Sequence, residues 1–159
     1  MRRNRAFNNN RASFSFTLIN GRCLLVAEYV PIEQKLNIEQ NEKPRILIVD
    51  DEEDICDFMK TFLENKGFNV DIAFRGYEAF LKIIEINYAA IISNIKMPGM
   101  NGIELLKMAK MLRKDLIFII QTACHDLEEE ALKWGAAAFV KKPVILDELQ
   151  HTVRRLVCK

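Results

Sequence analysis

Five short apolar runs, each followed by a segment with helical periodicity, dominate the last 115 residues of this chain. The runs are continuous rather than alternating, which is typical of strands buried on both faces of a sheet. Parallel strands need a crossover connection, usually a helix, between each pair. The pattern therefore predicts an α/β fold with a parallel sheet covered on both faces, with strands at Arg45–Val49, Phe68–Ala73, Ala89–Ser93, Leu116–Ile120 and Ala137–Val140.

The segments after the runs carry apolar residues three or four positions apart, which predicts one amphipathic helix behind each strand. Crossovers between parallel strands are right-handed, so five strand–helix units favour a doubly wound, flavodoxin-like (βα)5 sheet with strand order 2-1-3-4-5. A short helix over Leu127–Trp134 is expected to be capped by Asp126. The stripes expected to face the core are Ile55, Phe58, Met59, Phe62 and Leu63; Tyr77, Phe80, Leu81 and Ile84; Leu105, Met108, Ala109 and Leu112; and Leu149, Val153 and Leu156.

Residues 1–44 differ in composition and are predicted to be an N-terminal extension outside a domain of residues 45–159. Two apolar stretches flank Asn20-Gly21, a dipeptide typical of a type I′ hairpin turn. An isolated two-stranded hairpin is marginal in water, so a disordered extension is the simpler interpretation. The arginine-rich, acid-poor start also fits the composition of a mitochondrial transit peptide. Residues 31–44 are polar and are predicted to be a linker.

Charge and cysteine usage argue against several classes of function. The net charge is +1, with seven Lys or Arg against four Glu in residues 1–44 and sixteen basic against eighteen acidic residues after them. That balance gives no field that would attract nucleic acid or an anionic membrane, and no apolar run is long enough to span a bilayer. The four cysteines have no C-x-x-C spacing, so structural zinc is not expected.

Polar residues gather where the predicted strands end. Asp50 and Asp51 follow the first strand, Asn94 the third, Thr122 the fourth and Lys142 the fifth. Parallel strands bring their carboxyl ends to one edge, and ligands bind there at the point where the strand order reverses. Each residue alone has an ordinary explanation as a helix cap, a strand-end hydroxyl or a surface lysine. Together they predict a site for Mg²⁺ and phosphate, because Mg²⁺ prefers oxygen ligands and a lysine neutralises an anion.

The stretches RILIVDDEED, NIKMPGMNGIELL, IIQTA and GAAAFVKKP, in this order, resemble a response-regulator receiver domain of the chemotaxis or sporulation-relay kind. The resemblance covers residues 45–159 and implies a stand-alone signalling protein of a two-component system or phosphorelay rather than an enzyme. It also implies that Asp50 and Asp51 form an acidic Mg²⁺ pocket. Asp51 and the backbone carbonyl of Lys96 would be direct ligands, and Asn94 could add its side-chain carbonyl oxygen.

The same resemblance implies roles for three further residues. Thr122 would hydrogen-bond the phosphoryl group, and Lys142 would pair with it. Phe139 occupies the position of an aromatic switch whose rotamer reports the state of Thr122. The Lys142–Pro143 peptide bond is expected to be cis.

The chain departs from the family pattern at Asn94, where active receivers have the aspartate that takes a phosphoryl group from a histidine kinase. An acyl phosphate requires a carboxylate nucleophile. The amide nitrogen lone pair of Asn94 is tied up in resonance, and its oxygen carries no full negative charge. The pocket also falls from three acids to two, so Mg²⁺ binding is expected to be weak.

Several hypotheses about function follow from the asparagine at position 94. The favoured one is a degenerate receiver, or pseudo-receiver, that acts through protein–protein contacts without phosphorylation. An alternative is a working phosphorelay receiver whose aspartate is substituted in this sequence. Others are phosphorylation at another residue or control by another ligand, although strand alternation points Ser93 away from position 94. A flavodoxin-like metal-dependent enzyme, with His125 as its base, fits the fold alone.

The expected partners are a histidine kinase or phosphotransfer protein and a downstream target protein, in the cytoplasm, with the chain a monomer or transient dimer. The sequence stops at Lys159, directly after the last predicted helix, so any signal is expected to pass through the domain's own surface. By resemblance that surface comprises the fourth helix, the fifth strand and the fifth helix. Its residues would include Trp134, Lys141, Glu148, Gln150 and Arg154.

Overall fold

A computed structural model describes residues 13–19, 22–28, 43–123 and 125–158, and backbone contacts divide the chain into Met1–Glu42 and Lys43–Lys159. In the first, β1 (Ser13–Ile19) and β2 (Arg22–Glu28) pair antiparallel, with Ser13 opposite Glu28. This is the pairing that the hairpin interpretation predicts. The Asn20-Gly21 turn and most of the predicted linker lie outside the described residues.

The second unit contains a five-stranded sheet in which every neighbouring pair is parallel. Its order, β4-β3-β5-β6-β7, is the predicted 2-1-3-4-5 order counted within the domain, so the predicted fold class is confirmed. The strands form because the runs that build them are apolar on both faces, and the central ones are fully buried. They are β3 (Arg45–Val49), β4 (Asn69–Ala73), β5 (Ala90–Asn94), β6 (Ile117–Thr122) and β7 (Ala138–Lys141).

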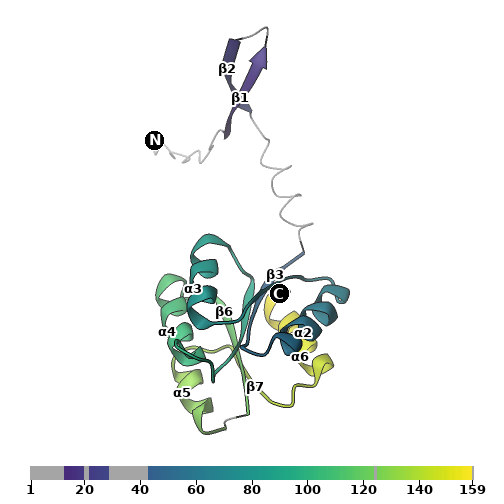
Figure 1. Cartoon of the computed structure of the whole chain (residues 1–159), viewed down its shortest axis with the longest axis vertical. Coiled ribbons are helices and arrows are strands. Elements are labelled where there is room, and N and C mark those ends of the chain that lie inside the picture. Colours follow the sequence, from purple (N-terminus) through teal and green to yellow (C-terminus); the bar gives the residue numbers. More distant parts are fainter. Residues whose placement is uncertain (1–12, 20–21, 29–42, 124, 159) are drawn as a thin grey trace, which may run out of the picture. The chain divides into compact units, whose positions relative to one another are not determined.

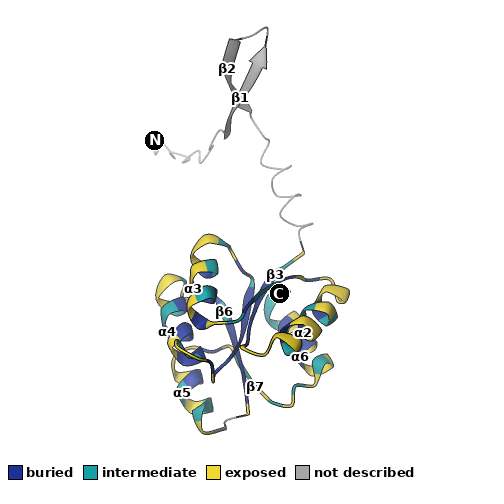
Figure 2. Cartoon of the chain, viewed as in Figure 1, coloured by how far each residue is buried: buried dark blue, intermediate teal, exposed yellow. Residues whose placement is uncertain are grey.

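Helices cover both faces of this sheet (Figure 1). On one face lie α2 (Glu53–Asn65) and α6 (Leu146–Val157). On the other lie α3 (Gly76–Glu85), α4 (Gly102–Leu112) and α5 (Glu128–Lys133), the last preceded by the 3-10 turn η1 (His125–Leu127). Figure 2 shows the resulting pattern, in which the sheet is buried and the outer helix surfaces are exposed.

The predicted core stripe of α3 is wrong in part. Tyr77 and Ile84 are 62% and 57% exposed, whereas Phe80 packs partly buried against the core as predicted. The fully buried face carries Ala79 and Ile83 instead. The helix approaches the β5–α4 connection closely, since a Cβ on Gly76 would collide with the backbone carbonyl oxygen of Met100.

Similar shifts occur in three other helices. On α2, Phe58 is 67% exposed, and Cys56 is buried in its place. On α4, Leu112 is half-exposed while Leu106 is buried. Gln150, expected on the polar side of α6, is buried. The predicted cap of α5 by Asp126 is wrong, because the residue before this helix is Leu127 and no side chain caps the helix. On α6, Leu149 and Val153 are buried as predicted.

We propose that residues 43–159 fold as an independent domain. Both hydrophobic clusters of the second unit consist of residues after Arg45, and the sheet takes all five strands from the same region. A chain shortened to residues 43–159 should therefore have the same thermal midpoint as the full chain in calorimetry. A midpoint lower by several degrees would show that residues 1–42 contribute to the stability of the domain.

Candidate functional site

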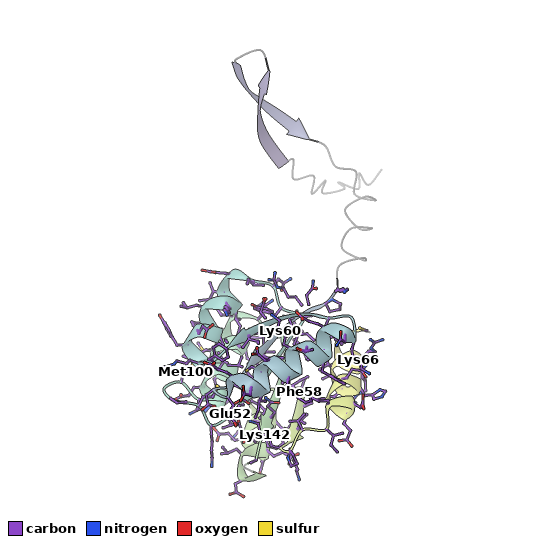
Figure 3. The ribbon with its side chains drawn as sticks, turned by 45° about the vertical axis from the view of Figure 1, so that its right-hand side comes forward. Glu52, Phe58, Lys60, Lys66, Met100 and Lys142 are labelled. Carbon is purple, nitrogen blue, oxygen red and sulfur yellow. The ribbon has the colours of Figure 1, made fainter. Side chains whose placement is uncertain are left out.

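The sheet brings the predicted site residues to one edge. Asp50 follows β3, Asn94 ends β5, Thr122 ends β6 and Lys142 follows β7, and the register places Asn94 beside Gln121 on the neighbouring strand. In Figure 3, Lys142 and Glu52 are labelled side by side at the N-terminal end of α2, and their side chains are 3.4 Å apart. Residues far apart in the sequence are thus within contact distance.

Asp50 is the centre of this site. Its carboxylate is fully buried and accepts four hydrogen bonds, two on each oxygen. Oδ1 accepts from the backbone of Glu52 at 3.3 Å and from Asn94 Nδ2 at 3.4 Å. Oδ2 accepts from Gln121 Nε2 at 3.1 Å and from Lys142 Nζ at 2.8 Å. Four donors match the four lone-pair sites of a carboxylate, which is how a buried charge is kept in a folded protein.

Asn94 presents its amide nitrogen to the acids. Nδ2 lies 3.4 Å from an oxygen of each aspartate, Asp50 and Asp51, and 3.0 Å from the backbone carbonyl oxygen of Lys96. These are the groups that the resemblance assigns to a cation. The Asn94 amide therefore donates hydrogen bonds to these groups, whereas a carboxylate at the same position could coordinate a metal ion together with them.

Two residues of this network were not predicted from the sequence. Gln121 is fully buried, and Glu52 contacts Lys142 from the loop before α2. The sequence does carry a signal for Gln121, because it is a polar residue directly after the apolar run IFII of the same strand. An acid just before a helix is ordinarily explained by the helix dipole, so the sequence around Glu52 gives no reason to expect its contact with Lys142, 90 residues away.

Thr122 and Phe139 lie on the neighbouring strands β6 and β7. Thr122 is buried, and its backbone carbonyl accepts a hydrogen bond from the Lys142 backbone at 3.0 Å. Phe139 lies opposite Ile120 on β7 and packs partly buried against the core. The Lys142–Pro143 peptide bond is cis, as predicted.

The turn between β5 and α4 fixes the position of Asn94. Asn101 caps α4 by accepting hydrogen bonds from the backbones of Ile103 and Glu104, and the Glu104 side chain accepts from the Asn101 backbone, forming a capping box. The Gly102 backbone donates to the carbonyl of Ile95 at 2.9 Å. A Cβ on Gly102 would collide with the Asn94 carbonyl oxygen, so this turn closes only with glycine there.

The thiol of Cys56 lies beside the site and is unreactive. Burial, with the negative charge of Asp50 nearby, raises the pKa of Cys56 to about 12. The thiol stays protonated at neutral pH and donates to the backbone carbonyl of Asp50 at 3.4 Å. Its contribution is structural, since a thiolate rather than a thiol is the nucleophile.

The donor set fits a divalent cation in part. The carboxylates of Asp50 and Asp51 and the carbonyl of Lys96 are hard oxygen ligands of the type that Mg²⁺ prefers. The amide nitrogen of Asn94 faces the same three groups and would have to turn away, presenting its carbonyl oxygen instead. Within the described part of the chain, no three His, Cys, Asp or Glu side chains gather as metal ligands.

A doubly wound sheet with an acid pair and a lysine at its switch point has the architecture of a flavodoxin-like signalling domain. The response regulator receiver domain matches residues 46–154, and the chain belongs to this family. Its place in two-component signalling follows from that membership.

Curated relatives include the transcriptional regulatory protein ZraR of Salmonella typhimurium, 34% identical over 112 residues, and FixJ of Bradyrhizobium diazoefficiens, 34% identical over 118 residues. These matches cover 69% and 72% of this chain, but only 25% and 57% of the relatives. The chain therefore spans a quarter to rather more than half of these proteins, and their full activities do not transfer to it.

Solved receiver structures match nearly over their whole length. The response regulator TrrA of Thermotoga maritima, in complex with Mg²⁺ and BeF, is 35% identical with a TM-score of 0.67, over 71% of this chain and 98% of that one. A CheY-like receiver of Methanospirillum hungatei is 36% identical with a TM-score of 0.70, over 73% and 94%. Among the described residues of this chain, no helix is long and apolar enough to cross a membrane.

Proposed function

We propose that this chain is a degenerate receiver, which keeps the fold and the protein-binding faces of its family but signals without phosphorylation. The observation that carries the proposal is the amide at position 94, whose nitrogen donates to Asp50, Asp51 and Lys96. An amide cannot form an acyl phosphate as a carboxylate does. The thiol of Cys56, which burial keeps protonated, offers no substitute nucleophile.

The test of this function is exposure of the full chain to Mg²⁺ and acetyl phosphate, followed by intact-mass measurement. The unmodified chain should gain no phosphoryl group. A base-labile adduct on the natural sequence would contradict the proposal, and peptide mapping would then identify the acceptor.

Mg²⁺ should bind weakly to the acid pocket. Two carboxylates rather than three face the cation position, and the Asn94 amide must turn before a cation can enter. Asp51→Ala should abolish the binding measured by isothermal titration, whereas Asp57→Ala, which removes an exposed acid of α2, should leave it unchanged. Binding that survives Asp51→Ala would place the cation elsewhere.

The proposed partner surface for a histidine kinase or phosphotransfer protein is the face formed by α2 and the β7–α6 loop. A groove of about 360 Å³ lies there, lined by apolar residues that include Phe58, Val144 and Leu146. Lys142 lines the same groove while its Nζ bonds Asp50, so the groove is continuous with the acid pocket. An apolar helix face of the partner would suit this groove.

A downstream target protein would use the face of α5, β7 and α6. Trp134 is 47% exposed at the end of α5, and the Lys107 ammonium group lies 4.6 Å from the centre of its ring. Lys107 also bonds Glu130 at 3.0 Å, which ties α4 to α5 beneath this face. An amphipathic exposed aromatic of this kind is enriched at protein interfaces.

The second candidate function is a working phosphorelay receiver whose aspartate is replaced in this sequence. The observations that favour it are the contacts of Asn94 with Asp50 and Asp51, the ion pair between Lys142 and Asp50, and the burial of Thr122. The base candidate of the enzyme alternative, His125, has a side chain outside the described residues.

A further inference from the structure

Gln121 is a buried polar residue whose presence in the strand β6 is not explained by a contribution to the stability of that strand. It lies on β6 between Ile120 and Thr122 and is completely shielded from solvent. Its Oε1 atom is buried, and no hydrogen-bond partner lies near it among the described residues. An unpaired buried oxygen costs free energy, so this end of the amide does not account for a glutamine at position 121.

The other end of the same amide has a clear partner. Nε2 of Gln121 donates to Asp50 Oδ2 at 3.1 Å, on the oxygen that also accepts from Lys142 at 2.8 Å. Asn94 donates to the opposite oxygen. Two side-chain amides and one ammonium group thus surround a single buried carboxylate.

The hydrogen bonds to Asp50 lower the affinity of the pocket for a divalent cation. A carboxylate attracts a divalent ion because its negative charge is otherwise uncompensated, and each donor that it accepts lowers that attraction. Gln121 supplies such a donor from inside the sheet, in a place that bulk water does not reach. Asn94 supplies another at the cation position itself.

We propose that Gln121 is a positioning residue which, together with Asn94, holds Asp50 in a closed arrangement that does not need a divalent cation. Removal of the Gln121 donor leaves Asp50 Oδ2 with the hydrogen bond from Lys142 and makes the pocket more attractive to Mg²⁺. The inference rests on the proposed function only for the identity of the acid pocket. It makes no use of phosphorylation.

The test compares the Mg²⁺ affinity of the full natural chain with that of two variants at position 121. Gln121→Met keeps the length and removes the donor, and Gln121→Glu replaces the donor with a further acid. Isothermal titration should show affinity about threefold higher for the methionine variant and about tenfold higher for the glutamate variant. Gln150→Met, at a buried glutamine of α6, should leave the affinity unchanged.

Thermal midpoints separate this role from a merely structural one. In EDTA, Gln121→Met should melt a few degrees below the natural chain, and Mg²⁺ should restore part of that loss while scarcely moving the natural chain. A structural role alone would lower the midpoint without changing the response to Mg²⁺. Equal Mg²⁺ affinity in the natural chain, Gln121→Met and Gln121→Glu would overturn the inference.

A measurement on the natural chain covers the case in which the variants do not fold. In EDTA, the side-chain amide protons of Gln121 and Asn94 should exchange with solvent at least tenfold more slowly than those of an exposed asparagine such as Asn65. Fast exchange at Gln121 would refute the inference. A phosphoryl adduct on the natural chain would refute the proposed function instead, and leaves these cation measurements unaffected.

Discussion

Asn94→Asp should convert a chain that acquires no phosphoryl group into one that does. The substitution changes one amide to a carboxylate of the same shape, next to Asp50, Asp51 and Lys142, which are already in place. A carboxylate oxygen would attack the phosphorus of acetyl phosphate, acetate would leave, and an acyl phosphate would remain on residue 94. Such transfer depends mainly on positioning and charge neutralisation, both of which this pocket supplies.

The measurement is intact mass after incubation with Mg²⁺ and acetyl phosphate, before and after hydroxylamine, which cleaves acyl phosphates. Asn65→Asp is the matched control, because it makes the same chemical change at an exposed position on α2 and should add no phosphoryl group. Failure of Asn94→Asp to react, while it remains folded, would mean that the pocket lacks more than a nucleophile. That result would favour a purely protein-binding role.

Gly102→Ala should destabilise the domain by about 3 kcal/mol, through overpacking of a backbone contact that cannot relax as a side chain would. The added Cβ would collide with the carbonyl oxygen of Asn94 and lie 2.9 Å from the Cα of Ile95. The thermal midpoint should fall by roughly 10 °C or more. The effect should reach the site as well, because the clash pushes on the residue that faces Asp50 and Asp51.

Gly67→Ala is the control for this prediction. Gly67 follows α2 with φ of +93° and has open space around its Cβ position, so alanine there costs only backbone strain of about 1 kcal/mol. Denaturant unfolding of both variants separates the two effects. A loss at Gly102 no larger than the loss at Gly67 would contradict the predicted clash with the Asn94 carbonyl.

The sheet order could be predicted because it depends on a coarse pattern, continuous apolar runs that alternate with helical segments. The site residues at the strand ends could be predicted for a related reason. Asp50, Asn94, Thr122 and Lys142 are polar residues directly after or at the end of buried strands, and parallel topology gathers such positions at one edge. No detailed packing is needed for either inference.

The helix faces and the hydrogen bonds could not be predicted in the same way. On α3, the stripe containing Tyr77 and Ile84 and the stripe containing Ala79 and Ile83 both have helical spacing, and the close approach at Gly76 decides between them. The sequence shows an amide at position 94 but not which of its two ends faces the acids. That orientation depends on the two acids after β3 and on the backbone carbonyl of Lys96.

The four donors to Asp50 also bear on how the domain folds. They lie 2, 44, 71 and 92 residues away in the chain, on segments at the ends of β3, β5, β6 and β7. In a partly assembled sheet, this carboxylate would keep its water, and burying it would cost free energy without the compensating bonds. Only the complete sheet supplies all of them, so intermediates that lack the last strands are penalised. The acid that defines the pocket thereby sharpens the cooperativity of folding.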